Sequence, residues 1–239
     1  MTPRGPRPVD GFSVRVVPEM PSVRDSIVGW PRASTCYAGV VKAVLSLSQR
    51  ATYADFLAVE SSSERRHEFL DGVIVAMAGG SDEHNAISLR FGALFTARLP
   101  RGCRAYSTDQ RFWIAATTRA RYSDGSIVCG KPEHPAHDPH ATTNPSIVVE
   151  VLSPSSAGDD DGDKRRDYQS LASLQAYVVA AQDARSVRVY RRAEHGGWRD
   201  VPEVYTSEQG FELPGLAQPI AVNEVYDDIL DAAGRSLLR

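Results

Sequence analysis

Hydrophobic residues follow two spacings from about residue 50 onward, and these spacings predict a mixture of helices and strands. The most apolar run lies in "NPSIVVEVLSPSS" and is typical of a strand buried on both faces. One carboxylate, Glu150, interrupts this run. Because an unpaired charge is costly inside a protein, Glu150 needs either a partner or a function.

Helical spacing is clearest in "SDEHNAISLRFGALFTARL", which Ser81 caps and whose first turn is acidic. Another helix begins in "ATYADFLAVE", because Thr52 followed by Asp55 is a capping-box pattern. A third helix is predicted from about Asp160 to Leu174, and a fourth near the end of "FELPGLAQPIAVNEVYDDIL". The helix in "SDEHNAISLRFGALFTARL" places on one face the residues His84, Ile87, Phe91, Leu94 and Phe95.

Strand-like stretches alternate with these helices. Asp71-Gly72 predicts a tight hairpin between "HEFL" and "VIVAMA". "SVRVYRR" is a possible edge strand, available for pairing in a homodimer. The other stretches are "CRAYSTDQRFWIA", "SIVCG", "SIVVEVL", "AYVVAAQ" and "GWRDVPEVY". The predicted fold class is α/β, on the border with α+β, with a mixed central β-sheet flanked by helices.

The chain divides into one domain and two extensions. Residues 1–50 are rich in Pro, Arg and Ser, and we expect a loosely ordered N-terminal extension with a possible short helix in "AGVVKAVLSL". Residues 1–44 could also be upstream sequence read from an early start codon. The domain spans residues 51–232, and residues 233–239 form a C-terminal tail.

Composition narrows the function classes. A formal net charge of −3 and an isoelectric point near 6.1 exclude a generally basic nucleic-acid-binding surface, so any such contact must be local. The three cysteines are scattered, predict no disulfide framework and fit a reducing compartment. No apolar run approaches a membrane span, and no signal peptide is recognisable. We therefore expect a cytoplasmic protein without a membrane partner.

Three carboxylates at strand ends are candidate site residues. Asp124 precedes the strand "SIVCG", Glu150 lies inside its own strand, and Glu68 precedes the hairpin turn. If neighbouring strands bring Asp124 and Glu150 together, both acids cannot stay ionised without a cation, and oxygen ligands on rigid strands suit Mg²⁺. The open alternatives are that Asp124 starts a turn with Gly125 and that Glu150 pairs with an arginine.

A lysine follows at helical spacing, because Lys164, Tyr168, Leu171 and Gln175 are spaced i, i+4, i+7 and i+11. Tyr168 and Leu171 are core candidates, so Lys164 shares their sheet-facing side, with Glu150 as its candidate counter-charge. The alternative is a lysine whose head group reaches water.

Two other segments contain metal-binding residue types. "CGKPEHPAHDPH" places Cys129 near His134, His137 and His140, a set that could bind Zn²⁺. Its spacing matches no standard zinc module and three prolines interrupt it, so we interpret it as an exposed loop. "SAGDDDGDK" lacks the spacing of a calcium loop and is interpreted as an acidic linker.

Five segments stand in a characteristic order: "HEFLDGVIVAMAG", "DEHNAISLRFGALF", "RYSDGSIVCG", "SIVVEVLSPSS" and "DKRRDYQSLASLQAYVVAAQDARSVRVYRR". In this order they resemble the Uma2 family, a bacterial group of restriction-endonuclease-like proteins within the PD-(D/E)XK nuclease superfamily. The resemblance covers roughly residues 45–230 and implies a restriction-endonuclease-like core.

The resemblance also implies site residues. Asp124 corresponds to the aspartate of "PD", Glu150 to the acid of "(D/E)XK", and Lys164 to the family's helical lysine after "VLSPS". Asp124, Glu150 and the backbone carbonyl of Val151 would hold Mg²⁺ or Mn²⁺ for hydrolysis of phosphodiester bonds. Lys164 would orient the attacking water or stabilise charge on the phosphate.

Two further residues and three departures belong to the same comparison. Glu68 would bind a second metal ion or hold the first ion's waters, and His84 at a helix start would place a phosphate or tune Glu68.

The departures are Ser123 for the proline of "PD", Leu152 for the usual strand lysine, and Ala176 for an acid that many relatives carry. The second departure requires the helical lysine to reach back to the site.

The leading hypothesis is a metal-dependent endonuclease that hydrolyses DNA, with Glu150 poorly solvated, close to Asp124 and Lys164, and facing a cleft. A non-catalytic nucleic-acid or protein-interaction module with the same fold is the alternative, and a structural or regulatory dimer subunit is a third. Basic residues near the proposed site gather in "QRFWIAATTRARY" and "DKRRDY", so we expect modest and strongly salt-dependent DNA affinity.

Overall fold

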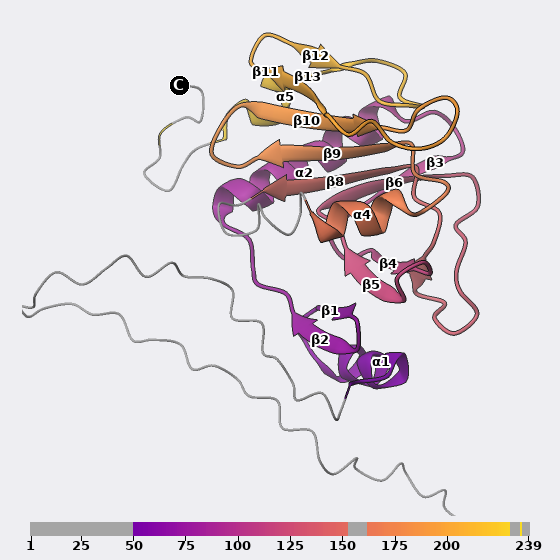
Figure 1. Ribbon diagram of the computed structural model, residues 1–239. Coiled ribbons are helices and arrows are strands. Elements are labelled where there is room, and N and C mark those ends of the chain that lie inside the picture. Colours follow the sequence, from indigo (N-terminus) through magenta and orange to yellow (C-terminus); the bar gives the residue numbers. More distant parts are fainter. Residues whose placement is uncertain (1–49, 153–161, 230–234, 236–239) are drawn as a thin grey trace, which may run out of the picture. The chain divides into compact units, whose positions relative to one another are not determined.

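The computed structural model describes residues 50–152, 162–229 and 235, in which helices and strands are mixed along the chain (Figure 1). The helices are α1 (Tyr53–Ser62), α2 (Asp82–Arg98), α4 (Asp163–Gln169) and α5 (Val222–Tyr226). The strands are β1 (His67–Leu70), β2 (Val73–Ala76), β3 (Cys103–Tyr106), β4 (Arg111–Ile114), β5 (Arg119–Tyr122), β6 (Gly125–Cys129), β7 (Ala141–Thr142), β8 (Ile147–Leu152), β9 (Ala176–Ala181), β10 (Ser186–Arg191), β11 (Glu203–Thr206), β12 (Gly210–Phe211) and β13 (Ile220–Ala221). The predicted α/β class is confirmed.

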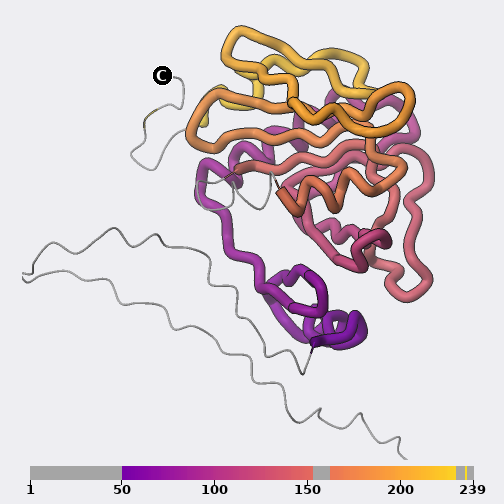
Figure 2. Tube along the Cα trace, viewed as in Figure 1, coloured from indigo at the N-terminus to yellow at the C-terminus, as the bar shows by residue number. Residues whose placement is uncertain are grey.

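The described strands form two larger sheets where the sequence predicted one. Six strands lie in the order β11-β10-β9-β8-β6-β3, with β8 and β9 parallel and the other neighbours antiparallel. Five strands lie in the order β2-β1-β5-β4-β7, and β12 pairs with β13. In Figures 1 and 2 the orange segment of β9 lies between β8 and the orange segment of β10. The six-stranded sheet is the predicted mixed sheet.

Alternate residues of β8 face opposite sides of this sheet. Val149 packs in a cluster that contains Phe91 of α2, whereas Val148 packs in a cluster that contains Tyr168 of α4. The helices α2 and α4 therefore cover opposite faces of the sheet (Figure 1). Because both faces are covered, every residue of β8 is buried.

The local signals for helix starts and turns are confirmed. Thr52 and Asp55 form the reciprocal hydrogen bonds of a capping box at the start of α1. The backbone N–H of His84 donates to the Ser81 hydroxyl at the start of α2. The Asp71-Gly72 turn joins β1 and β2 with φ angles of 53° and 82°, and glycine adopts this left-handed region without a steric penalty.

Two element predictions are wrong. Helix α4 ends at Gln169 rather than near Leu174, and the next residues form turns in which Leu171 and Leu174 are buried. Buried residues in turns can mimic helical spacing, which explains the error. The stretch "SVRVYRR" is mostly β10, which lies between β9 and β11 and is no edge, so the homodimer contact expected there loses its basis.

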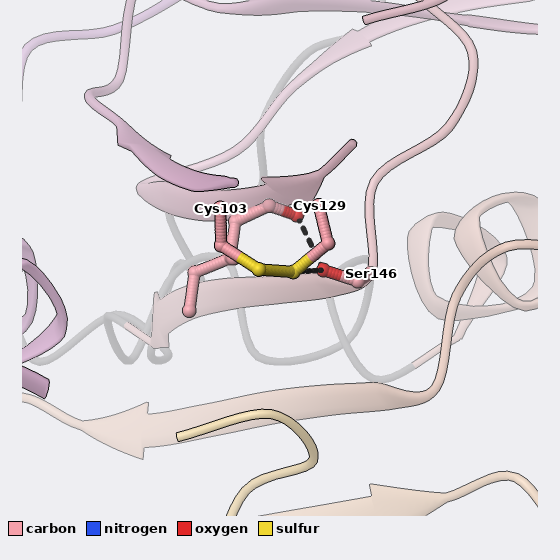
Figure 3. Close-up of a disulfide and its surroundings, with 4 residues drawn as sticks. Cys103, Cys129 and Ser146 are labelled. Atoms are coloured by element: carbon pink, nitrogen blue, oxygen red, sulfur yellow. Dashed lines mark hydrogen bonds between the residues drawn. A yellow bond between two sulfur atoms is a disulfide. The ribbon is translucent and has the colours of Figure 1, made fainter. Parts of the chain in front are cut away.

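Cys103 and Cys129 form a disulfide that the cysteine pattern did not predict (Figure 3). The antiparallel register of β3 and β6 places them opposite each other, with Cα atoms 4.0 Å apart. The Ser146 hydroxyl donates to the Ile127 carbonyl at 3.0 Å and lies 3.7 Å from Cys129 Sγ. The prediction of no disulfide is therefore wrong, because strand register rather than sequence spacing joins these cysteines. The cysteines no longer support a reducing compartment.

Several sequence-based predictions fall outside the described residues. They include most of the N-terminal extension with its possible helix, the tail apart from residue 235, and most of the acidic linker. Within the described part, no helix has the length and apolar character needed to cross a membrane.

Candidate active site

The start of β6 and the end of β8 lie side by side and bring Asp124 next to the peptide that follows Glu150. The Asp124 N–H donates to the Val149 carbonyl at 3.0 Å, and the Val151 N–H donates to Asp124 Oδ2 at 2.7 Å. Because the N–H and C=O of one strand residue point to the same side, the Val151 carbonyl faces the edge on which Asp124 lies. Gly125 is the first residue of β6, so the turn alternative for Asp124 is wrong.

His84, in the first turn of α2, contacts the same carboxylate. Its Nε2 lies 3.1 Å from Asp124 Oδ2. Burial alone would raise the pKa of Asp124, but the hydrogen bond to His84, the charge of Lys164 and the Val151 N–H hold that pKa below its ordinary value. The carboxylate is therefore ionised at neutral pH. The sequence linked His84 to Glu68, whereas the structure links it to Asp124.

Glu150 is 1% exposed and forms an ion pair with Lys164. The Lys164 ammonium donates to Glu150 Oε2 at 2.7 Å from the first turn of α4. Lys164 is itself buried, so its head group does not lie in open water. The expected burial of Glu150 and its closeness to Lys164 are confirmed, whereas Asp124 contacts the N–H of the following residue, Val151. The expected cleft stays a prediction, because residues 153–161 lie outside the described part.

Glu68 joins the site through Lys164. Its Oε1 lies 4.0 Å from Lys164 Nζ and accepts a hydrogen bond from the Tyr122 N–H at 3.2 Å. Its Oε2 accepts from Arg121 Nη1 at 3.0 Å. Among the described residues these contacts do not join Glu68 to Asp124. The predicted site residues therefore form a row of paired charges and not one cluster of carboxylates.

Three charged residues that the sequence pattern did not single out hold this row in place. Arg121 Nε donates to Asp167 Oδ2 at 2.9 Å, and Arg119 Nη1 reaches the same oxygen at 3.1 Å. Arg119 Nε also donates to Asp71 Oδ1 at 3.0 Å. A signal for them exists in the sequence. Arg119 and Arg121 alternate along one strand face, and Asp167 follows Lys164 by one helical turn.

Tyr168 adds a buried hydroxyl on the sheet-facing side of α4. Its side chain is fully buried against Phe112 and Tyr177, as its helical spacing predicts. Its hydroxyl makes no hydrogen bond in the part of the chain that the structure describes. Burial, followed by the charge of Glu150, raises the pKa of Tyr168 far above its ordinary value, so the hydroxyl keeps its proton.

The oxygen donors at this edge fit a hard divalent cation. Carboxylates of Asp124 and Glu150 and the carbonyl of Val151 are the ligand types that Mg²⁺ and Mn²⁺ prefer. Both contacts of the Asp124 carboxylate to described residues fall on Oδ2, so Oδ1 can accept a further ligand. The described residues hold no group of three or more His, Cys, Asp or Glu side chains placed for a metal ion, so other oxygens would have to complete the coordination shell.

The zinc alternative is not supported. Cys129, its only sulfur, is bonded to Cys103 and cannot act as a thiolate ligand. The Nδ1 atom of His134 lies 2.8 Å from the Ala141 carbonyl, so this nitrogen is used within the loop. His134, His137 and His140 are exposed, as the loop interpretation predicts.

Comparison with known proteins identifies the family of this chain. The model of the Uma2 family, whose description is "Putative restriction endonuclease", matches residues 53–221. The chain belongs to the Uma2 family. An uncharacterized protein of Synechocystis sp., slr1290, is 31% identical over 173 residues, which cover 72% of this chain and 89% of that protein. A second one, sll1609, is 30% identical over 158 residues, which cover 65% and 88%.

A solved structure shows the same fold. It is a crystal structure described as a "putative nuclease belonging to DUF820" from Anabaena variabilis. Its TM-score is 0.56 at 17% identity, and the match covers 70% of this chain and 93% of that one. At this identity the similarity concerns the fold alone.

The three departures from the Uma2 pattern have clear positions. Leu152 packs in the apolar cluster beneath α4, and Lys164 reaches Glu150 from that helix, as this departure requires. Ser123 is buried and its hydroxyl donates to the Gly125 carbonyl at 3.2 Å. Ala176 is fully buried at the start of β9, where a carboxylate would need a partner.

Proposed function

We propose that this Uma2 protein is a metal-dependent endonuclease that hydrolyses phosphodiester bonds in DNA. One observation carries the proposal. The Lys164 ammonium lies 2.7 Å from Glu150, and the Asp124 carboxylate accepts a hydrogen bond from the peptide N–H that follows Glu150. Three groups of the types used for phosphoryl transfer thus belong to this proposed site, Asp124 just before β6, Glu150 on β8 and Lys164 on α4.

Asp124, Glu150 and the Val151 carbonyl would hold Mg²⁺ or Mn²⁺, which when bound lowers the pKa of a water ligand and neutralises charge on the phosphate. His84 orients the Asp124 carboxylate through its contact with Oδ2. Lys164, paired with Glu150, stabilises negative charge on the phosphate or orients the attacking water. Glu68 Oε1 lies 4.0 Å from the same ammonium, and Glu68 is itself paired with Arg121.

The two basic stretches, "QRFWIAATTRARY" and "DKRRDY", offer few side chains that could contact DNA phosphates. The side chains of Arg111, Arg119 and Arg121 bond to carboxylates of the protein, and the Arg165 guanidinium lies 4.5 Å from the centre of the Tyr190 ring. Arg166 is exposed, beside Asp163. With few phosphate contacts, DNA affinity is expected to be modest, and because those contacts release counterions it falls steeply with salt.

Cleavage of supercoiled plasmid, linear duplex and single-stranded DNA in Mg²⁺ or Mn²⁺ tests the proposal. Wild-type protein is expected to cleave, and Asp124→Ala and Lys164→Ala to lose about 100-fold or more of that rate, because each removes a group that acts on the transition state. Asp109→Ala is the control, because its side chain is 70% exposed and pairs only with Arg66 among the described residues. Equal cleavage by all four proteins would indicate a contaminating nuclease and overturn the proposal.

The second candidate is a non-catalytic nucleic-acid or protein-interaction module. One observation favours it. Lys164 contacts an oxygen of Glu150 and His84 contacts an oxygen of Asp124, so these two oxygens are already used within the protein. Calorimetric titration with Mg²⁺ separates the two candidates. Binding that disappears in Glu150→Ala supports the endonuclease, whereas no binding at millimolar Mg²⁺ supports the module.

A further inference from the structure

The buried guanidinium of Arg121 takes no part in the proposed chemistry. It nevertheless contacts Glu68, which lies near Lys164, and Asp167, which lies on the same helix as Lys164. Arg121 lies on β5 and is 1% exposed. Its Nη1 donates to Glu68 Oε2 on β1 at 3.0 Å, and its Nε donates to Asp167 Oδ2 on α4 at 2.9 Å. The planar guanidinium can bond two carboxylates at once, which an ammonium group does less well.

Asp167 anchors the short helix that carries Lys164. Helix α4 has seven residues, and Gly162 at its start provides no side-chain cap, so its own propensity does not hold it. Asp167 follows Lys164 by three residues and lies on the same side of the helix. Its bonds to Arg121 and Arg119 therefore set the position of α4 on the sheet, and with it the position of Lys164.

Glu68 competes with Glu150 for the Lys164 ammonium. Nζ lies 2.7 Å from Glu150 Oε2 and 4.0 Å from Glu68 Oε1. Arg121 neutralises Glu68 and so leaves the ammonium on Glu150. Without that charge Glu68 would be an uncompensated carboxylate, and Lys164 is the other cation within 4.0 Å of it among the described residues. The ammonium would then shift from Glu150 towards a position shared by both carboxylates.

We propose that Arg121 is a positioning residue that keeps Lys164 on Glu150, by neutralising Glu68 and by anchoring α4 through Asp167. The effect of Arg121 on cleavage rests on the proposed endonuclease function. The effect of Arg121 on which carboxylate Lys164 contacts does not rest on that function. It can be measured in a protein without any activity.

Arg111→Gln is the matched control for Arg121→Gln. Arg111 is also buried, lies on the neighbouring strand β4, and bonds two carboxylates, those of Glu60 and Asp138. Among the described residues its hydrogen-bond partners are Asp138, Glu60 and Tyr122, so Arg111→Gln matches the loss of a buried guanidinium without removing a contact to Glu68, Glu150 or Lys164.

Crystal structures of the two variants test the positioning directly. In Arg121→Gln, Lys164 Nζ is expected to lie within about 3 Å of Glu68 and farther from Glu150 than the 2.7 Å of the wild type. In Arg111→Gln it is expected to stay on Glu150, as in the wild type. An ammonium that remains on Glu150 in Arg121→Gln would overturn the proposal.

Cleavage kinetics supply the second readout. Arg121→Gln is expected to lower kcat about 100-fold with KM little changed, because a misplacement of about 1 Å can have that effect. Arg111→Gln should keep the wild-type kcat at temperatures where it is folded. Equal losses of kcat in both variants would overturn the positioning role. A wild-type protein that fails to cleave DNA would count against the proposed function and leave the crystallographic test unaffected.

Asp167→Asn tests the anchor if Arg121→Gln does not fold. The amide keeps the shape of the side chain but removes the charge that Arg121 and Arg119 share. We expect a longer distance between Lys164 and Glu150 and a lower kcat. An unchanged distance would exclude Asp167 as the anchor of α4.

Discussion

Two buried carboxylates, Glu150 and Asp138, show how single residues of this chain carry charge below the surface. Each forms an ion pair with a cation, Glu150 with Lys164 and Asp138 with Arg111. Such a pair adds little net stability, but removal of one partner leaves an uncompensated buried charge. The two ion pairs are therefore expected to contribute similarly to stability and to differ in their role. Glu150 faces the candidate active site, whereas Asp138 ties the loop before β7 to β4 and α1.

Asp138→Asn is expected to lower the free energy of unfolding by about 3 kcal/mol at pH 7. Burial alone would raise the pKa of Asp138, but hydrogen bonds from Arg111 and Tyr53 hold it below the ordinary value of 3.8. The contribution of Asp138 to stability is therefore complete above pH 3.8 and is lost as the pH falls through the lower pKa of the folded protein.

Urea denaturation between pH 7 and pH 3 measures this effect. The difference between wild type and Asp138→Asn should be constant near neutral pH and shrink in the most acidic samples. Asp109→Asn, at an exposed ion pair, should show only a small difference throughout. A difference for Asp138→Asn that grows towards low pH would contradict the assigned direction of the pKa.

At the scale of elements, the cross-strand disulfide is the feature with the clearest effect on stability. It joins β3 to β6 across a sequence separation of 26 residues. Closing a loop of this length in the unfolded chain is expected to contribute about 3 kcal/mol. The double variant Cys103→Ser/Cys129→Ser should therefore unfold at lower urea concentration than the wild type, by that amount of free energy.

Cys36→Ser is the control for the disulfide, because it leaves Cys103 and Cys129 in place. Addition of a dithiol reductant should destabilise the wild type and Cys36→Ser equally and leave Cys103→Ser/Cys129→Ser unchanged. If the reductant leaves the wild type as stable as before, the pair contributes nothing to stability in solution.

Elements were predictable where the signal is local. The capping box of Thr52 and Asp55, the cap of Ser81 and the Asp71-Gly72 turn depend on neighbouring residues, and all three occur as predicted. The end of α4, the internal place of β10 and the disulfide depend on pairing between distant segments. Such pairing leaves no pattern in a single sequence.

The candidate site was partly predictable for the same reason. The carboxylate in an apolar run and the lysine on the core-facing side of a helix are local signals, and the structure joins them as Glu150 and Lys164. The contact of His84 with Asp124 and the bonds of Arg121 to Glu68 arise only from the packing of α2 and β5. Sequence alone therefore indicated the charges that are proposed to act, but not the contacts that hold them in position.

For the whole molecule, the balance of charges at the site predicts that folding is independent of a metal ion. Lys164 compensates Glu150, Arg121 compensates Glu68, and His84 contacts Asp124. Addition of a chelator at pH 7 should therefore shift the midpoint of thermal unfolding by less than about 2 °C, or less than about 1 kcal/mol.

Thermal unfolding followed by circular dichroism, with chelator or with Mg²⁺, checks this expectation. In Lys164→Ala, added Mg²⁺ should raise the midpoint more than in the wild type, because a bound cation then replaces the missing ammonium. A large loss of stability on chelation of the wild type would mean that the cation is part of the fold.

The ion pair between β8 and α4 also constrains the order in which the chain can fold. Glu150 precedes its partner Lys164 by 14 residues, and the parallel pairing of β8 with β9 requires the intervening segment to cross over first. If other parts of the chain covered the Glu150 side of β8 before α4 packs there, the Glu150 carboxylate would be buried without the Lys164 ammonium. Burial of the central strand, docking of α4 and pairing with β9 should therefore occur as one cooperative step, and a nascent chain that stops before Lys164 cannot complete it.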